Sequence, residues 1–182
     1  KHKTVDDTPY GGGSGMLIRA DVVASSLDKN ISNADEPIIY LSPKGKKFDQ
    51  KSAKRFMNKN INIICGHFEG VDQRLLETRN IEEVSIGDFI LSGGEVGALL
   101  VIDTIVRLIP GVVGNPNSLT EETFERNLLE YPQYTKPQKW EKKNVPEVLL
   151  SGDHAKIKDW RLGQSEDITR RRRADLWEKY KK

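Results

Sequence analysis

The sequence predicts an α/β fold in which helices cover both faces of a parallel sheet. Short, continuously apolar runs such as "PIIYL" (37–41) and "INIIC" (61–65) alternate with helix-like segments. Such runs are typical of strands that are buried on both faces, as parallel strands usually are. Three of the runs end in loops rich in small residues, "YLSPKG", "CGHFEG" and "SIGDFILSGGE". In open α/β sheets, the loops beyond the carboxyl ends of the strands form the ligand crevice.

Local signals define the elements one after another. The polar, then glycine-rich opening "KHKTVDDTPYGGGSGM" predicts a structured loop. Asp49 and Asp72 are suitable N-caps for the helices that follow them, and Pro110 ends the most apolar helix. The expected elements are helices at 20–28, 50–58, 73–79 and 95–109, and strands at 37–41, 61–65, 82–86 and 88–91.

The C-terminal part of the chain has a different composition. The stretch "GVVGNPNSLT" is a linker by composition, and Thr120 followed by "EETF" suits the start of a helix. The stretch "EYPQYTKPQKW" is rich in proline and aromatic residues and is expected to be extended, whereas 154–182 predicts one or two helices. We therefore predict a first domain over 1–110, a linker over 111–122 and a small helical domain over 123–182.

Composition and charge exclude several classes of protein. The single cysteine among 182 residues, Cys65, rules out an intrachain disulfide framework and fits a reducing cytoplasm. No apolar run approaches the length of a membrane span, and no signal peptide is visible. Residues 1–135 carry a net charge of −4 and residues 136–182 a net charge of +6. The basic end predicts either a contact with a polyanion or a solvated, lysine-rich tail.

The sequence motifs of several common chemistries are missing. The glycine-rich loop lacks dinucleotide-site spacing, there is no Walker-type Gly-Lys-Ser/Thr, and the histidines and the cysteine are too scattered for a zinc site. What remains is a ligand held by backbone groups and a few charges. Glu69, between Gly66 and Gly70, could bind an ammonium group or a metal, or could cap the next helix. Arg107 could act on a ligand or pair with Asp103.

Seven motifs occur in a fixed order along the chain: "TVDDTPYGGGSGM", "IYLSPKGKKFDQ", "IICGHFEGVDQR", "SIGDFILSGGE", "RLIPGVVGN", "LLEYPQYTKP" and "VPEVLLSGDHAKIKDWR". Together they resemble the bacterial tRNA (guanine-N1)-methyltransferases, the TrmD family of the SPOUT class. The resemblance implies an α/β methyltransferase domain with a deep trefoil knot, a small helical C-terminal domain and a homodimer. It also implies that a strand and a helix of the family precede the first residue of this chain.

The reaction that the resemblance implies is methyl transfer from S-adenosylmethionine to N1 of the guanosine immediately 3′ of the tRNA anticodon. The family uses an aspartate as base, a position that falls here on Glu122 with Glu121 as a rival, and an arginine that falls on Arg107. Glu69 would lie beside the cationic donor or an associated Mg²⁺ ion. By motif, the donor site comprises Tyr40, Leu41, Ser42, Pro43, Gly66, Glu69, Gly70, Ser85, Ile86, Gly87, Leu91, Gly93 and Gly94.

The basic end acquires a role from the same resemblance. Trp140 and Trp160 could stack on bases, although Trp160 is the better candidate for the core of the small domain. Two alternatives stay open: a SPOUT dimer that binds RNA or donor without catalysis, and a SPOUT methyltransferase for another RNA position. The residues expected to contact tRNA phosphates are Lys136, Lys139, Lys142, Lys143, Lys156, Lys158, Arg161 and the arginines at 170–173.

Overall fold

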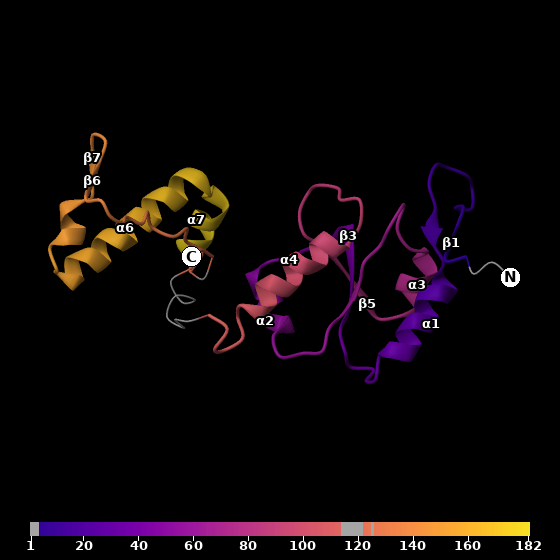
Figure 1. Ribbon diagram of the computed structural model, residues 1–182. Helices are drawn as coiled ribbons and strands as arrows, with labels where there is room; N and C mark the ends of the chain where they lie inside the picture. Colours follow the sequence, from indigo (N-terminus) through magenta and orange to yellow (C-terminus); the bar gives the residue numbers. More distant parts are fainter. Residues whose placement is uncertain (1–3, 114–121, 125) are drawn as a thin grey trace. The chain divides into compact units, whose positions relative to one another are not determined.

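The computed structural model of the chain describes residues 4–113, 122–124 and 126–182. The chain divides into two compact units, Lys1–Val113 and Gly114–Lys182 (Figure 1). The first unit contains the α/β elements and the second contains mainly helices. Among the described residues, no helix has both the length and the apolar character needed to cross a membrane.

A three-stranded parallel sheet forms the centre of the first unit, with strand order β4-β3-β5. β3 (Ile38–Lys47) lies between β4 (Asn62–Ile64) and β5 (Ile81–Ser85), and it pairs in parallel with both. The predicted parallel sheet is therefore confirmed. Because the three strands run in the same direction, the loops that follow them leave the sheet at the same edge.

Helices cover both faces of this sheet, as the continuous apolar strands predict (Figure 1). α1 (Ala20–Asn30) and α3 (Gln73–Thr78) pack together on one face, and α2 (Gln50–Phe56) and α4 (Glu95–Val106) pack together on the other. The predicted caps are confirmed, since the carboxylate of Asp49 accepts a hydrogen bond from the backbone of Ser52 and that of Asp72 from Arg74. Each face of the sheet has its own buried residues. Tyr40 of β3 and Leu75 of α3 are buried on the face that α1 and α3 cover. Ile39 of β3, Phe56 of α2 and Val101 of α4 are buried on the other face.

Two details of the first unit differ from the predictions. The expected strand at 88–91 is wrong, because β5 ends at Ser85, whose hydroxyl bonds to both the N–H and the carbonyl of Gly87 and folds the chain back. The segment after it is a loop with exposed apolar side chains. The opening loop contains a short antiparallel pair that the sequence did not indicate, β1 (Asp6–Asp7) with β2 (Leu17–Ile18).

Within β3, the chain passes the backbone of β5 at very short range. Leu41 and Lys46 both pair with Val84, so residues 42–45 form an excursion between two contacts with the same residue. A Cβ atom added to Gly45 would lie 2.4 Å from the carbonyl carbon of Glu83. The two backbones therefore touch at a point where only glycine fits.

Replacing Gly45 by alanine should destabilise the first unit by about 2–3 kcal/mol, because the methyl group meets rigid backbone instead of a movable side chain. Chemical denaturation of the variant followed by circular dichroism measures the change. Gly163, inside a helix of the second unit, has no neighbour within 4 Å of an added Cβ, and Gly163→Ala should instead stabilise its helix by about 0.5–1 kcal/mol. Equal effects of the two substitutions would contradict the crossing as the cause.

The described residues of the second unit form two helices, a turn of 3-10 helix and a short hairpin. α6 (His154–Arg172) is followed directly by α7 (Ala174–Tyr180), which confirms the predicted helical segment. The 3-10 helix spans Glu147–Leu150, and the hairpin joins β6 (Lys139–Trp140) to β7 (Lys143–Asn144). The hydroxyl of Thr169, fully buried on α6, donates to the Ser165 carbonyl and accepts from the backbone N–H of Leu129. This pair of bonds anchors the extended segment to the helix.

The predicted helix start at Thr120 falls outside the described residues. The described residues just after it, 122–124, form a bend and a turn. The ring of Phe124 lies under the guanidinium of Arg173, 5.7 Å from it, so this turn contacts the end of α6 within the same unit.

Candidate functional site

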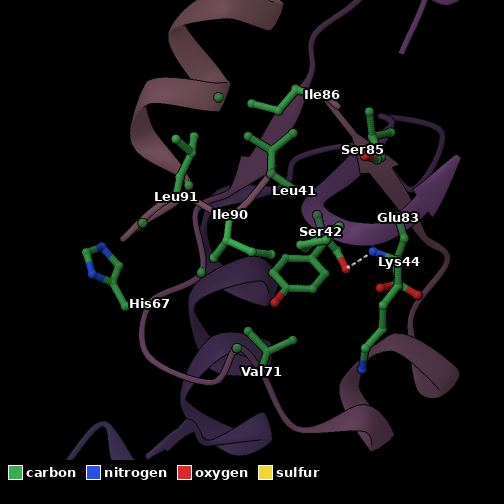
Figure 2. Close-up of a pocket in the computed structure, with 18 of the residues that line it drawn as sticks. Leu41, Ser42, Lys44, His67, Val71, Glu83, Ser85, Ile86, Ile90 and Leu91 are labelled. Carbon is green, nitrogen blue, oxygen red and sulfur yellow. Dashed lines mark hydrogen bonds between the residues drawn. The ribbon is translucent and has the colours of Figure 1, made fainter. Parts of the chain in front are cut away.

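A pocket of about 420 Å³ lies at the edge of the sheet where the three parallel strands end (Figure 2). Its wall comes from residues 40–44 of β3, from the loop after β4, and from the end of β5 with the loop that leads to α4. The volume is in the range typical of sites for small molecules and cofactors. The strand order brings together three loops that are up to about 50 positions apart in the sequence.

Every residue that the motifs place in the donor site lines this one pocket. The structure thus brings together three groups of predicted residues, one from each strand end. They are Tyr40, Leu41, Ser42 and Pro43 within β3, then Gly66, Glu69 and Gly70 after β4, and Ser85, Ile86, Gly87, Leu91, Gly93 and Gly94 at the end of β5 and in the loop that follows it.

Apolar side chains and tightly packed backbone make up most of the wall. Leu41, Ile86, Ile90 and Leu91 turn toward the same hollow (Figure 2). Tyr40, which is buried, lies directly under the loop after β4, and a Cβ added to Gly70 would come within 2.7 Å of its hydroxyl. Burial raises the pKa of the Tyr40 phenol above its ordinary value, so the hydroxyl is neutral at physiological pH. The floor of the pocket is therefore uncharged and closely packed.

Charged side chains surround this apolar floor. Glu69, Glu83 and Lys44 line the pocket, and two of the three are acidic. Within the described part of the chain, the carboxylate of Glu69 has no hydrogen-bond or ion-pair partner. The interpretation of Glu69 as a helix cap is wrong, because Asp72 caps α3 instead. The pocket thus presents a carboxylate that remains available to a cationic ligand.

A side-chain pair joins the two loops on either side of the pocket. Nε2 of His67 bonds to the carboxylate of Glu95, in the first turn of α4, and this contact lowers the pKa of Glu95. The backbone supports the same junction, since the N–H of Gly94 donates to the carbonyl of Gly66 at 3.0 Å. His67 and Gly93 also form an isolated antiparallel bridge. The loops after β4 and β5 are therefore held together by one side-chain bond and a short backbone ladder.

The two other residues predicted to be catalytic do not line the pocket. Arg107 follows the last turn of α4, so it lies about 18 Å along the helix axis from the end that borders the pocket. Its backbone N–H donates to the carbonyl of Asp103, but no ion pair joins these two side chains in the described structure. Glu122 belongs to the second unit, where it is half-buried. Its rival Glu121 lies outside the described residues.

Several pocket residues were missed by the sequence analysis. Glu83 could have been found, because it lies two positions before Ser85 on β5 and therefore shares a face of the strand with it. Lys44 follows the predicted run directly, and its backbone N–H bonds to the Ser42 hydroxyl at 3.2 Å. Phe68, Phe89 and other apolar residues gave no signal, since exposed aromatic residues in loops have no periodicity. The further lining residues are Lys44, His67, Phe68, Val71, Gln73, Leu76, Glu83, Val84, Phe89, Ile90, Ser92 and Gly97.

Metal ligands are sparse around the pocket. Across the described ranges, no group of three or more His, Cys, Asp or Glu side chains comes together as a metal site would need. The thiol of Cys65 is half-buried, and burial raises its pKa, which keeps it protonated and unreactive.

The fold and the pocket define an α/β protein with a pocket of ligand size, lined in part by carboxylates, at the carboxyl edge of a parallel sheet. Comparison with known proteins narrows this class. The profile of the family "tRNA (Guanine-1)-methyltransferase TrmD" matches residues 1–179. The chain therefore belongs to this family, and the resemblance seen in the sequence motifs is confirmed.

Individual relatives agree with the family match. The chain is 70% identical over 183 residues to the tRNA (guanine-N(1)-)-methyltransferase of Pelagibacter ubique (strain HTCC1062), covering 100% of this chain and 80% of the relative. It is 52% identical to the enzyme of the same name from Jannaschia sp. (strain CCS1), covering 100% of this chain and 76% of the relative. A third such protein, from Rhodopseudomonas palustris (strain ATCC BAA-98 / CGA009), is 53% identical, with coverages of 97% and 72%.

Proposed function

We propose that this protein transfers a methyl group from S-adenosylmethionine to N1 of the guanosine immediately 3′ of the tRNA anticodon. One observation carries the proposal: in a member of this methyltransferase family, all thirteen positions expected to hold the donor line a single pocket. We further propose that the protein acts in the cytoplasm, where a single free cysteine is chemically compatible with its surroundings.

The pocket suits the proposed donor in shape and charge. S-adenosylmethionine supplies a methyl group that its sulfonium centre already activates. The apolar wall of Leu41, Ile86 and Leu91 would cover the flat adenine, and glycine backbone amides would reach its polar edge. Glu69 would stabilise the positive charges of the donor, and Lys44, in the same wall, would bind the donor's carboxylate. A Mg²⁺ ion held through Glu69 is the finer form of this proposal, because Mg²⁺ is commonly bound by one carboxylate together with ligands and water.

The acceptor needs a base, because N1 of guanine carries a proton at neutral pH. In our proposal the carboxylate of Glu122 takes this proton while the methyl group arrives. The guanidinium of Arg107 lies near the guanine O6 and stabilises the negative charge that deprotonation leaves there. Neither side chain lines the donor pocket, so the bound tRNA and additional protein surface would have to complete the reaction site.

A second copy of the chain in a homodimer would supply that additional protein surface. The exposed apolar residues of α4 support such a dimer. The helix is apolar on nearly all sides, yet only Gly97, Ala98, Val101 and Ile105 are buried. The exposed apolar residues of α4 are Val96 at 64%, Leu99 at 66%, Leu100 at 44%, Ile102 at 46% and Val106 at 41%. An exposed apolar stripe of this kind marks an interface, and a second copy of the chain is the occupant proposed.

Replacing Leu99 by arginine should convert the protein from a dimer to a monomer, because each of two symmetric patches would then bury a guanidinium without a partner. Analytical ultracentrifugation measures the mass in solution. A control is Leu162→Arg on α6, which is also exposed, at 44%, and should leave the mass unchanged. A dimer that survives Leu99→Arg unchanged would place the interface elsewhere.

The trefoil knot implied by the resemblance is also a proposal. The close approach of Gly45 to the backbone of β5, with Leu41 and Lys46 both paired to Val84, supports it, because a threaded chain requires backbone segments in contact. The predicted division into 1–110, 111–122 and 123–182 stays a proposal in the same way, with the donor site in the first part and tRNA contacts in the last.

Incubation of the protein with labelled donor and tRNA transcripts tests the function. One transcript has guanosine 3′ of the anticodon, and the matched transcript has adenosine there. The expected result is label at N1 of that guanine in the first transcript and none in the second. Donor binding without transfer would favour the non-catalytic SPOUT dimer, and labelling of both transcripts would favour a SPOUT enzyme for another position.

Loss of the junction between the pocket loops should weaken donor binding moderately. His67→Ala or Glu95→Gln is expected to raise the donor dissociation constant about two- to fivefold, as suits a solvent-exposed ion pair. Isothermal titration calorimetry measures the constant. The Arg79–Asp28 pair, also exposed but outside the pocket, provides the control, since Arg79→Ala should leave donor affinity unchanged. Equal affinities for all three variants would show that the backbone ladder alone holds the loops.

A further inference from the structure

An exposed tryptophan stands on a lysine-rich hairpin of the second unit. The Trp140 hairpin, residues 138–145, consists of β6, the two-residue loop Glu141–Lys142 and β7. Glu141 has a φ of 54°, which turns the chain sharply, and the N–H of Val145 closes the ladder on the carbonyl of Gln138 at 3.0 Å. The hairpin projects away from the helices of its unit (Figure 1).

The indole of Trp140 is mostly exposed among the described residues of its unit. Its side chain is 64% exposed, and every residue from 133 to 144 is exposed. Trp160 shows the contrast, since it is half-buried and its ring lies 6.3 Å from that of Tyr134. Both tryptophans were candidates for stacking on bases, and the structure distinguishes them by their exposure. A large aromatic side chain held in solvent on a two-stranded ladder indicates a binding role.

The charges around the indole are almost all positive. Lys136, Lys139, Lys142 and Lys143 lie in the exposed segment, and Glu141 is the one acidic residue between 133 and 144. In the described structure none of these four lysines forms an ion pair. Lys143 is the cross-strand partner of Trp140, so an ammonium group and an indole share one face of the hairpin. Lysine is depleted at protein–protein interfaces, so this composition favours a nucleic acid over a protein partner.

We propose that the Trp140 hairpin is an RNA-binding element in which the indole stacks on an unpaired base of the tRNA substrate. The lysines beside it contact the phosphates that flank this base. Aromatic side chains bind unpaired bases by stacking, and neighbouring cations hold the backbone in place. The inference rests on the proposed function only in its choice of tRNA as the RNA. It assigns the site of contact to a surface separate from the donor pocket.

The first test compares Trp140→Ala with Trp140→Phe in the full chain. Trp140→Ala should raise the tRNA dissociation constant about 5- to 100-fold, the usual range for loss of one stacked base. Trp140→Phe keeps an aromatic face and should stay within about threefold of the original protein. Fluorescence anisotropy with a labelled tRNA transcript measures both, and an unchanged helical circular dichroism spectrum with an unchanged thermal unfolding curve shows that each variant is folded. Binding of tRNA by Trp140→Ala as tight as that of the original protein would overturn the inference.

The second test concerns the lysines. Combined Lys139→Ala, Lys142→Ala and Lys143→Ala should reduce the slope of log affinity against log salt by about 2, because each phosphate contact on a single strand contributes about 0.7. The control removes three exposed lysines of the first unit, Lys29, Lys51 and Lys59, and should change the slope much less. Equal slopes for the two triple variants would overturn the phosphate contacts.

These measurements separate the inference from the proposed function. If the original protein binds tRNA through Trp140 but labels no guanine N1, the function fails and the RNA-binding element stands. If it labels guanine N1 and Trp140→Ala binds and labels equally well, the inference fails and the function stands.

Discussion

Replacing Glu122 by glutamine is expected to lower the rate of methyl transfer about 10²- to 10⁴-fold, the usual contribution of a positioned general base. Glutamine has nearly the same size, but it cannot take the proton from guanine N1. Because Glu122 does not line the donor pocket, the dissociation constant of the donor should not change. Single-turnover assays with labelled donor measure the rate, and calorimetry measures the donor affinity.

Two further variants sharpen this prediction. Glu122→Asp keeps the carboxylate and should retain most of the rate, whereas Glu147→Gln, on the 3-10 helix of the same unit, should retain all of it. The rate of Glu122→Gln should also rise with pH, because hydroxide can replace the missing base. A rate within twofold of the original protein would remove Glu122 from the reaction and leave Glu121 as the candidate.

Replacing Glu69 by glutamine is expected to raise the donor dissociation constant about 10- to 100-fold. Its carboxylate has no partner among the described residues and lines the pocket, so its charge is available to a cationic ligand. Loss of an interaction with a charged group of this kind costs about 1.5–3 kcal/mol. Calorimetric titration with S-adenosylmethionine measures the change, and S-adenosylhomocysteine, which lacks the sulfonium charge, should be affected much less.

The matched control for Glu69 is Glu77→Gln, an exposed carboxylate on α3 that does not line the pocket. It should bind the donor as the original protein does. If Glu69→Gln binds both ligands as tightly as the control, the carboxylate does not recognise the donor. If instead turnover is lost while donor affinity is kept, and EDTA reproduces that loss in the original protein, Glu69 acts through Mg²⁺.

The sequence predicted those parts of the fold that local chemistry decides. Asp49 and Asp72 cap α2 and α3 because a carboxylate next to free backbone N–H groups is favourable whatever surrounds it. The pairing of β1 with β2 was out of reach, because strands of two residues have no periodicity to detect. The run at 88–91 has the apolar pattern of a strand, but its apolar side chains line the pocket, so the strand predicted there was wrong.

The residues of the candidate site also divide into those that the sequence could predict and those that it could not. The donor loops could be predicted because each one follows a buried strand and parallel strands end at one edge. Glu83 was within reach as well, since it shares a strand face with Ser85, but the place of Lys44 in the wall depends on how residues 42–45 pass β5. The bond between His67 and Glu95 joins residues 28 positions apart, and neither residue type indicates which residue it will contact. Contacts between distant loops require the folded backbone.

The crossing at Gly45 links the pocket to the integrity of the whole sheet. Residues 41–44 form one wall of the site, and Leu41 and Lys46 both pair with β5, so that wall cannot swing outward while β5 stays in place. Local opening of a lid is therefore a poor route for entry on this side. The amide protons of Val84 and Ser85 would then exchange with solvent only when the entire first unit unfolds.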